Sequence, residues 1–371
     1  MKRITLAKPI FSDSDIKEIN RNIRTILLSG WLTTGRFAEK LEVRFRTEVD
    51  TKHAISLCSA TAALHTMMAS LHLKPDDEVI VPANTFASTA NAVLYEGAKV
   101  VLADCDESSF NVNASTLSAR ITARTRALVV THIGGNPCDM HEIIDLCKDR
   151  NIELFEDAAH AIGSTYRGRS CGSFGSGAAF SLYPTKVVTS GEGGVLVTNS
   201  DHLANFARLY RNVGRRNVGA GPIEILGHNY RMSDVHAVIG LNQMKHLSRF
   251  IAMRNRLADF YSRRLKPISW IRPQVLTAHS RSSFYAYIVR ITEESPICRD
   301  RLIEKLTSKG IETTIMFKPI HSQPYFRGLE SASCPSAETL GRESLVLPLH
   351  AGMSNRDVDN VVSVIEEVAS G

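Results

Sequence analysis

The sequence predicts an α/β fold, in which a larger domain with a mostly parallel sheet between helices is followed by a smaller α+β domain. Three observations predict it. Short apolar runs alternate with helical segments through the first part of the chain. These runs are apolar at nearly every position, which is typical of strands buried on both faces. The 371 residues are enough for about two domains of roughly 100–200 residues each.

The first elements are helical. Residues 12–29 carry isoleucine and leucine at helical spacing, and Gly30 can end this helix. Residues 34–49 are typical of a second helix. Strands are expected next at 54–57, 78–82, 99–103, 126–130, 152–155, 177–181 and 194–198. The helices expected between them lie at 61–71, 88–95 and 140–149.

The last third of the chain has a different pattern. A helical stretch at 232–265 is the expected connection, and we place the boundary near its middle, giving domains of 1–245 and 246–371. The elements expected after it are strands at 283–291 and 311–316 and helices at 300–308 and 354–368. This order predicts an α+β domain around an antiparallel sheet.

Composition argues against several classes of protein. Lys and Arg total 44 against 38 Asp and Glu, a net charge of only +6, and no long basic block marks a nucleic-acid face. The seven cysteines form no CxxC pair, which disfavours a disulfide framework or a zinc cluster and favours reduced thiols. No signal region follows the N-terminus, and no run approaches the roughly 18 apolar residues of a membrane span. We therefore expect a cytoplasmic protein without a metal, nucleic-acid or membrane partner.

An acid and an amine each follow an expected strand. Asp157 comes just after 152–155, at the sheet edge where α/β proteins bind ligands. Lys186 follows Pro184, which breaks a strand, and the glycine-rich turn at 191–194 lets backbone approach backbone. Taken singly, such an acid is more often a helix cap and such a lysine a solvated surface residue.

Two further segments offer a phosphate site and an aromatic face. Ser59, Ala60 and Thr61 open a helix, whose free N–H groups suit a phosphate, and Phe86 is placed to stack on a planar ring. Singly, these are more often a plain N-cap and a core aromatic. Together, the four segments supply an amine, an acid, a phosphate cradle and an aromatic face. Pyridoxal phosphate (PLP) requires this set.

These motifs resemble the sugar aminotransferase family often called the DegT family, and the similarity runs from about Pro9 to Val368. Its landmarks are EDAAH (156–160), FSLYPTK (180–186), GEGG (191–194), RNVG (211–214), GHNYRMS (227–233) and KPIHSQP (318–324). The resemblance implies the aspartate-aminotransferase-like PLP fold type I, with a mostly parallel seven-stranded sheet. It also implies a PLP-dependent transaminase.

The resemblance further implies roles for single residues. Lys186 would form the Schiff base and move protons, Asp157 would pair with the ring nitrogen, and His160 would lie beside the cofactor. The other implied cofactor contacts are Ser59, Ala60, Thr61, Phe86 and Ser181, with Asn229 supplied by the second subunit of a homodimer. The implied substrate contacts are Thr33, Arg36, Tyr183, Arg231, Lys318 and His321. One departure is Ala60, which stands where many members have glycine.

The implied reaction moves an amino group from an amino acid, with L-glutamate expected, to a keto-sugar, with a nucleotide-linked keto-deoxysugar expected. A cyclitol acceptor stays open. A sugar dehydratase is disfavoured because that branch replaces the lysine with histidine, whereas Lys186 is present. A PLP-binding regulator without catalysis is disfavoured because Lys186, Asp157 and Thr61 are all present. A generic nucleotide-binding enzyme is disfavoured too, because no GxGxxG opens the first βα unit and no GxxxxGK[ST] occurs.

Overall fold

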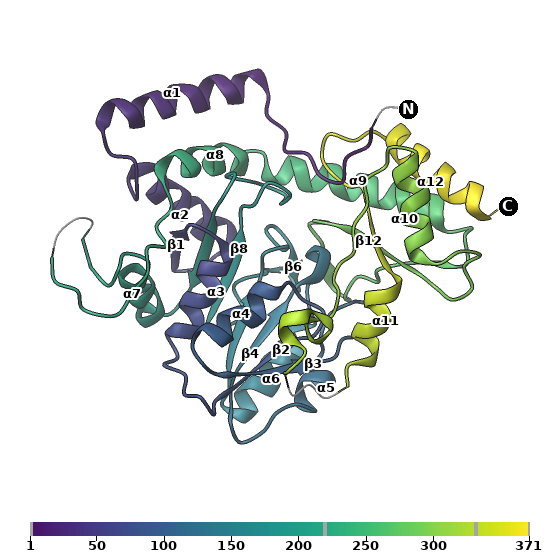
Figure 1. Cartoon of the computed structure of the whole chain (residues 1–371). Helices are drawn as coiled ribbons and strands as arrows, with labels where there is room; N and C mark the ends of the chain where they lie inside the picture. The colour runs from purple at the N-terminus through teal and green to yellow at the C-terminus, as the bar shows by residue number, and fades with distance from the viewer. Residues whose placement is uncertain (1–2, 218–220, 330–332, 370–371) are drawn as a thin grey trace.

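A seven-stranded sheet forms the centre of the computed structural model, which describes residues 3–217, 221–329 and 333–369 (Figure 1). Its strands lie in the order β1 (His53–Leu57), β9 (Gly194–Thr198), β8 (Gly177–Ser181), β5 (Glu153–Asp157), β4 (Thr125–Thr131), β2 (Glu78–Pro82) and β3 (Lys99–Ala103). Only β9 runs against the others, since it pairs antiparallel with both β1 and β8. The predicted mostly parallel sheet is confirmed.

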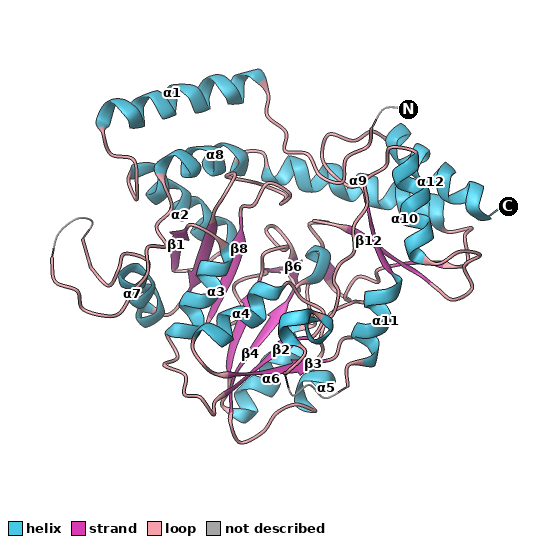
Figure 2. Cartoon of the chain, in the orientation of Figure 1, coloured by secondary structure: helices cyan, strands magenta, loops and turns pink. Residues whose placement is uncertain are grey.

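Helices cover both faces of this sheet (Figure 2). The helices on one face are α3 (Ala60–Ala69), α4 (Ala87–Tyr95) and α7 (Asp201–Tyr210). The helices on the other are α2 (Arg36–Val49), α8 (Asp234–Met244), α5 (Ala114–Ser118) and α6 (Met140–Arg150). Along β8, Ala179 packs into the first layer and Phe180 into the second, because successive strand side chains point to opposite faces. The helix α1 (Asp13–Ser29) packs outside the second layer, over α8 (Figure 1).

The C-terminal part has an α+β arrangement, as predicted. Its antiparallel sheet has the order β10 (Ile271–Pro273), β12 (Tyr287–Ile291) and β13 (Ser344–Leu347). The helices packed against it are α9 (Leu247–Leu265), α10 (Arg299–Ser308) and α12 (Asn355–Ala369). The remaining elements are α11 (Pro335–Glu343), the small sheet β11 (Ser280–Arg281), β6 (Thr165–Tyr166) and β7 (Arg169–Ser170), and 3-10 turns at Ile133–Gly135, Ile320–Ser322 and Pro324–Phe326. The domain boundary near residue 245 stays a prediction.

Three predicted elements differ in the structure. The stretch 232–265 forms two helices, α8 and α9, which are interrupted at residues 245–246. The stretch 311–316 is not a strand, because Ile311 bridges to the N-terminal segment and Thr314 to β13, so no continuous ladder forms. The predicted strand 283–291 begins only at Tyr287, because Phe284 has a φ of 47° and turns the chain.

The described residues include no helix that combines the length and the apolar character needed to cross a bilayer.

Candidate active site

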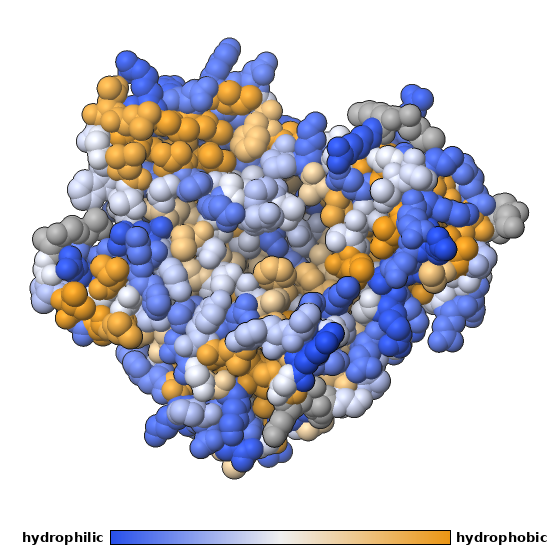
Figure 3. Space-filling model, viewed as in Figure 1, coloured by the Kyte–Doolittle hydropathy of each residue, from blue (hydrophilic) through white to orange (hydrophobic). Residues whose placement is uncertain are grey.

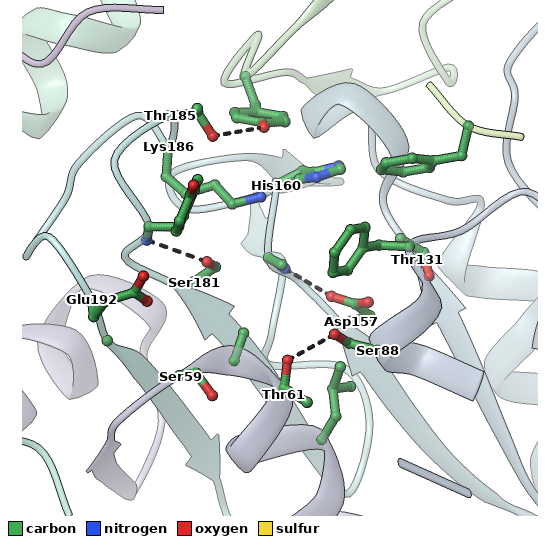
Figure 4. Close-up of a pocket in the computed structure, with 18 residues that line it drawn as sticks. Ser59, Thr61, Ser88, Thr131, Asp157, His160, Ser181, Thr185, Lys186 and Glu192 are labelled. Atoms are coloured by element: carbon green, nitrogen blue, oxygen red, sulfur yellow. Dashed lines mark hydrogen bonds between the residues drawn. The ribbon is translucent and has the colours of Figure 1, made fainter. Parts of the chain in front are cut away.

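A cavity of about 400 Å³ opens at the carboxyl ends of the central parallel strands. Asp157 is the last residue of β5 and Ser181 the last of β8, so both reach the same edge of the sheet. The sequence-predicted residues that line the cavity are Ser59, Ala60, Thr61, Phe86, Asp157, His160, Ser181, Tyr183 and Lys186. Figure 4 shows Asp157, His160 and Lys186 turned toward one space. Its size is within the roughly 300–1,000 Å³ of small-molecule sites.

The carboxylate of Asp157 lies at the floor of the cavity and is only 3% exposed. It accepts hydrogen bonds from the Thr89 hydroxyl at 2.7 Å and from the Ala159 backbone N–H at 3.1 Å. Burial raises the pKa of Asp157, while these hydrogen bonds and the charge of Lys186 act in the opposite direction. A buried carboxylate with spare lone pairs is suited to a cationic N–H in the cavity.

The amine of Lys186 enters from a tight turn after β8. The strand ends at Ser181, Pro184 lies in the turn that follows, and the Lys186 backbone N–H donates to the Tyr183 carbonyl at 3.0 Å. The Lys186 ammonium lies 4.4 Å from the centroid of the Tyr285 ring. The hydroxyls of Thr185 and Tyr285 are 3.2 Å apart, as the dashed line at Thr185 marks in Figure 4. The predicted loop therefore presents its lysine to the cavity.

The imidazole of His160 is buried between the sheet edge and the C-terminal part. Its ring stacks on Tyr285, with the centroids 4.2 Å apart and the planes at 21°. Its Nδ1 atom is buried and has no hydrogen-bond partner in the described chain. Burial, and after it the charge of Lys186, lowers the pKa of His160 well below its usual value. The ring is therefore neutral at physiological pH and keeps a free polar atom.

The start of α3 forms the opposite end of the cavity. The Ser59 side chain caps the helix by accepting from the Ala62 backbone N–H at 3.1 Å. The N–H groups of Ala60 and Thr61 have no intrahelical acceptor, as in any first helical turn. The helix dipole and these donors make this end an anion site. Ala60 is helical and has no positive φ, so its departure from glycine causes no backbone strain.

The glycine-rich turn allows this close approach. In the sheet, Gly194 lies opposite both Leu57 and Ser181. A Cβ atom on Gly194 would lie 2.2 Å from the carbonyl carbon of Ser59, a distance that real structures do not show. The predicted function of this turn, letting backbone approach backbone, is therefore present in the structure.

Six residues that the resemblance implied lie outside this cavity in the single chain: Thr33, Arg36, Asn229, Arg231, Lys318 and His321. The Arg36 guanidinium lies over the Phe37 ring, Arg231 donates to Asn212 at 3.0 Å, and His321 pairs with Glu338 at 3.2 Å. Thr33 donates to the carbonyl of Met232 at 3.4 Å.

The other two of these residues have different surroundings. Asn229 is exposed on a short bridge with Asn212. Lys318 lines a neighbouring hollow that shares Phe86 and Phe317 with the main cavity.

Other lining residues were not predicted as site residues: Leu64, Ser88, Thr131, Ala159, Thr185, Glu192, Gly193, Tyr285 and Phe317. Tyr285 and Phe317 come from the C-terminal part and carry no local signal, since the sequence around them is typical of ordinary strands. Thr89 follows Phe86 by one helical turn, so its contact with Asp157 required the packing of α4 on the sheet. The described residues include no group of three or more His, Cys, Asp or Glu suited to a metal ion.

Comparison with known proteins gives close relatives over almost the whole chain. The chain is 36% identical over 370 residues to GDP-perosamine synthase of Caulobacter vibrioides, a match that covers 99% of each protein. Its fold matches a putative sugar aminotransferase of Streptococcus pneumoniae in its PLP form, with a TM-score of 0.91, 27% identity and 99% coverage of each chain. It also matches DesI, crystallised in the presence of its TDP-sugar product, with a TM-score of 0.91, 29% identity, and 99% and 93% coverage.

Together, the fold, the cavity and these relatives define a PLP-dependent sugar aminotransferase. The model of the DegT/DnrJ/EryC1/StrS aminotransferase family matches residues 13–366, and the chain belongs to this family. The predicted family, fold type, cofactor and enzyme class are thereby confirmed.

Proposed function

We propose that this aminotransferase takes the amino group of L-glutamate and transfers it to a keto-deoxysugar linked to a nucleoside diphosphate. Two similar proteins support the nucleotide linkage, because one is a GDP-perosamine synthase and the other, DesI, was crystallised with a TDP-sugar. The cavity supports the cofactor half of the proposal, since it combines an amine, a buried carboxylate and a helix N-terminus.

The residues of the cavity fit PLP by their chemistry. The buried carboxylate of Asp157 would hold the ring nitrogen, and the free N–H groups of Ala60 and Thr61, with the hydroxyls of Ser59 and Ser181, would hold the phosphate. Phe86 is 59% exposed beside the cavity and would cover one face of the ring. The orphaned Nδ1 of His160 would gain a partner on the ring's polar substituents.

Three residues of the chain would each have a separate role in the reaction. When bound, PLP supplies an aldehyde that forms an imine with an amine and a ring that accepts electrons. Lys186 Nζ, free once the donor's amine has taken its place, would accept the proton from the donor's α-carbon and pass it to the carbon that carried the aldehyde. Asp157 would keep a proton on the ring nitrogen of the bound cofactor. His160 is neutral and therefore adds no second positive charge beside the Lys186 amine.

We also propose a homodimer in which Asn229 of the partner subunit completes each cavity. Asn229 is exposed and lies outside the cavity of its own chain. Large apolar side chains are exposed along α1, including Ile16, Leu27 and Leu28, and Figure 3 shows apolar surface gathered over this helix. An apolar patch of this kind is typical of a surface that another protein covers.

The central test combines spectroscopy with one substitution. The wild-type protein should show a visible absorbance band from PLP linked to Lys186, and L-glutamate should bleach it. Lys186→Ala should lose the band and turnover while keeping the far-UV circular dichroism spectrum. Lys99→Ala, which removes an exposed lysine paired with Asp76, is the control and should behave as wild type. A fully active Lys186→Ala enzyme would remove this lysine from the mechanism.

The acceptor is tested with the pyridoxamine form of the enzyme. A panel of nucleotide-linked keto-sugars, free keto-sugars and keto-cyclitols is added, and the return of the visible band is measured. We expect only nucleotide-linked keto-sugars to restore the band efficiently. Equal rates with the free sugar would contradict the nucleotide linkage, and a response to the cyclitol alone would change the substrate class.

The shared cavity is tested by mixing two inactive variants, Lys186→Ala and Asn229→Asp. Aspartate at 229 would repel the cofactor phosphate, so each variant alone should be impaired. A mixed dimer contains one cavity with both native residues only if Asn229 acts across the interface. Activity that appears after mixing supports the shared site, and its absence in a proven mixed dimer contradicts it.

A further inference from the structure

Tyr285 contacts three parts of the active site although it belongs to the C-terminal part of the chain. The Lys186 ammonium lies 4.4 Å from the Tyr285 ring centroid, on its face. The His160 ring stacks on Tyr285 at 4.2 Å. The Tyr285 hydroxyl is 3.2 Å from that of Thr185, the residue just before the lysine. One aromatic ring thus contacts the amine, the loop that carries it and the neighbouring imidazole.

The backbone of Tyr285 is held firmly behind the ring. The buried guanidinium of Arg254 donates from Nη1 to the carbonyls of Phe284 and Tyr285, both at 3.1 Å, and to that of Leu349 at 2.8 Å. Gly135 packs directly against this segment, because a Cβ atom there would lie 3.1 Å from the Tyr285 nitrogen. Hydrogen bonds and close packing therefore both hold the backbone that carries the ring.

We propose that Tyr285 is a positioning residue that holds the free Lys186 amine, and favours its protonated form, whenever the lysine is not bonded to the cofactor. This inference rests on the proposed function of Lys186. A cation over an aromatic face is attracted to the ring electrons, and the attraction shifts a protonation equilibrium by about two- to fivefold.

The position matters because the free lysine carries a proton. The C–H bond at the donor's α-carbon breaks as an N–H bond forms at Lys186 Nζ, and this N–H bond breaks as the proton reaches the cofactor's aldehyde carbon. The electron pair from the broken C–H bond would enter the cofactor ring and then form the new C–H bond at the aldehyde carbon, so no other reactant is consumed. A ring that holds the ammonium keeps this proton near both carbons and slows its loss to water.

Other charged and polar groups line the same cavity. The acids in the same cavity are Asp157 and Glu192, which both attract an ammonium, and Tyr183 contributes a further hydroxyl. His160 is neutral, since burial and the charge of Lys186 lower its pKa. The contribution of the ring must therefore be separated from that of the acids by changing Tyr285 alone.

Competitive labelling of the apo enzyme measures how the Tyr285 ring affects the protonation of the Lys186 amine. Trace acetic anhydride is added across a pH series, and acetylation of Lys186 is quantified by mass spectrometry against exposed Lys99 in the same molecules. The plateau at high pH reports access to the amine, whereas the midpoint of the curve reports its protonation. Tyr285→Leu removes the aromatic face, and Tyr285→Phe is the matched variant that keeps the face and removes only the hydroxyl.

We expect the midpoint for Lys186 to move down by about 0.4–0.7 pH units in Tyr285→Leu and to stay in place in Tyr285→Phe. With PLP and α-deuterated glutamate, the Leu variant should also lose more label to solvent, and the Phe variant should restore retention. An unmoved midpoint in a folded Tyr285→Leu protein would overturn the inference. An equal shift in both variants would assign the effect to the hydroxyl bond with Thr185 and overturn the role of the ring.

The failure of this inference can be distinguished from the failure of the proposed function. If wild type, Tyr285→Leu and Tyr285→Phe all show the visible band and only the midpoint fails to move, the positioning role alone is wrong. If wild type shows no band, the assignment of Lys186 is wrong and the inference falls with it.

Discussion

Replacing Asp157 with asparagine separates what this carboxylate does for the cofactor from what it does for the fold. The asparagine has nearly the same shape, so its Oδ1 can still accept from the Ala159 N–H while its amide donates to the Thr89 hydroxyl. The cofactor loses a charge-assisted bond, worth about 1.5–3 kcal/mol, and gains at best a neutral one of about 0.5–1.5 kcal/mol. A difference of about 1–1.5 kcal/mol lowers PLP affinity by about 5–13-fold. Turnover should fall at least as far.

The same substitution should weaken PLP binding but should not lower the stability of the apo protein at neutral pH. Because burial raises the pKa of Asp157, the folded state holds this proton at pH values where the unfolded state has lost it. The stabilisation is therefore present below the unfolded pKa of about 4 and is lost as the pH rises through the folded pKa. At pH 7.5 the buried charge destabilises the apo protein, and an amide removes this cost. Apo Asp157→Asn should be at least as stable as the wild type at pH 7.5, with its advantage gone at pH 4.

The assay is thermal unfolding of both proteins at pH 4 and pH 7.5, with and without PLP, together with an absorbance titration of PLP. PLP should raise the unfolding temperature of the wild type more than that of the variant. Unchanged PLP affinity would refute the pairing of Asp157 with the cofactor. A large loss of stability in the apo variant at pH 7.5 would show that the carboxylate is mainly structural.

Three further outcomes are expected. Burial lowers the pKa of His160, so the folded state resists its protonation and the free energy of unfolding falls below about pH 6.5, by up to about 1.4 kcal/mol per pH unit. In urea unfolding between pH 6.5 and 5.5, apo His160→Asn should lose less of this free energy per pH unit than the wild type. An identical pH dependence of the two proteins would contradict this cause. Gly194→Ala should move the start of α3 and weaken PLP binding, which an absorbance titration measures. The control is Gly328→Ala, whose new methyl group meets open space and which should bind PLP as the wild type does. Equal PLP affinities of the two variants would argue against the close approach at Gly194. Phe45→Ala removes a fully buried ring that packs against Phe180 and should lower the free energy of unfolding by about 3–5 kcal/mol in denaturant titration. A loss under 1 kcal/mol would show that neighbouring side chains repack into the space that the ring leaves.

The sequence was most informative where structure is local. The strands β2 and β3 were predicted with their observed ends, because a continuous apolar run bounded by turns needs no distant contact to be recognised. The motif residues Asp157 and Lys186 were placed at the sheet edge for a similar reason, since each follows its strand within a few residues. The helix start at Ser59 carried its own cap.

Predictions failed where an element depends on its partners. The run 311–316 has strand-like residues, yet its two ends pair with different segments. The strand β13 was not predicted, because its four residues are too few to show the alternating or continuously apolar pattern of a strand. The sequence pattern predicts that Phe284 belongs to a strand, but its positive φ turns the chain there, and the next residue, Tyr285, lines the cavity.

By itself, the sequence determined the α/β sheet, the family and the residues whose chemistry suits PLP, because those signals lie in short, contiguous segments. Only the tertiary structure decided what surrounds them. The hydroxyls of Thr185 and Tyr285, 100 residues apart, meet, and Thr89 reaches Asp157 across 68 residues. No local pattern encodes such contacts, because they arise when separate elements pack their side chains into one shared volume.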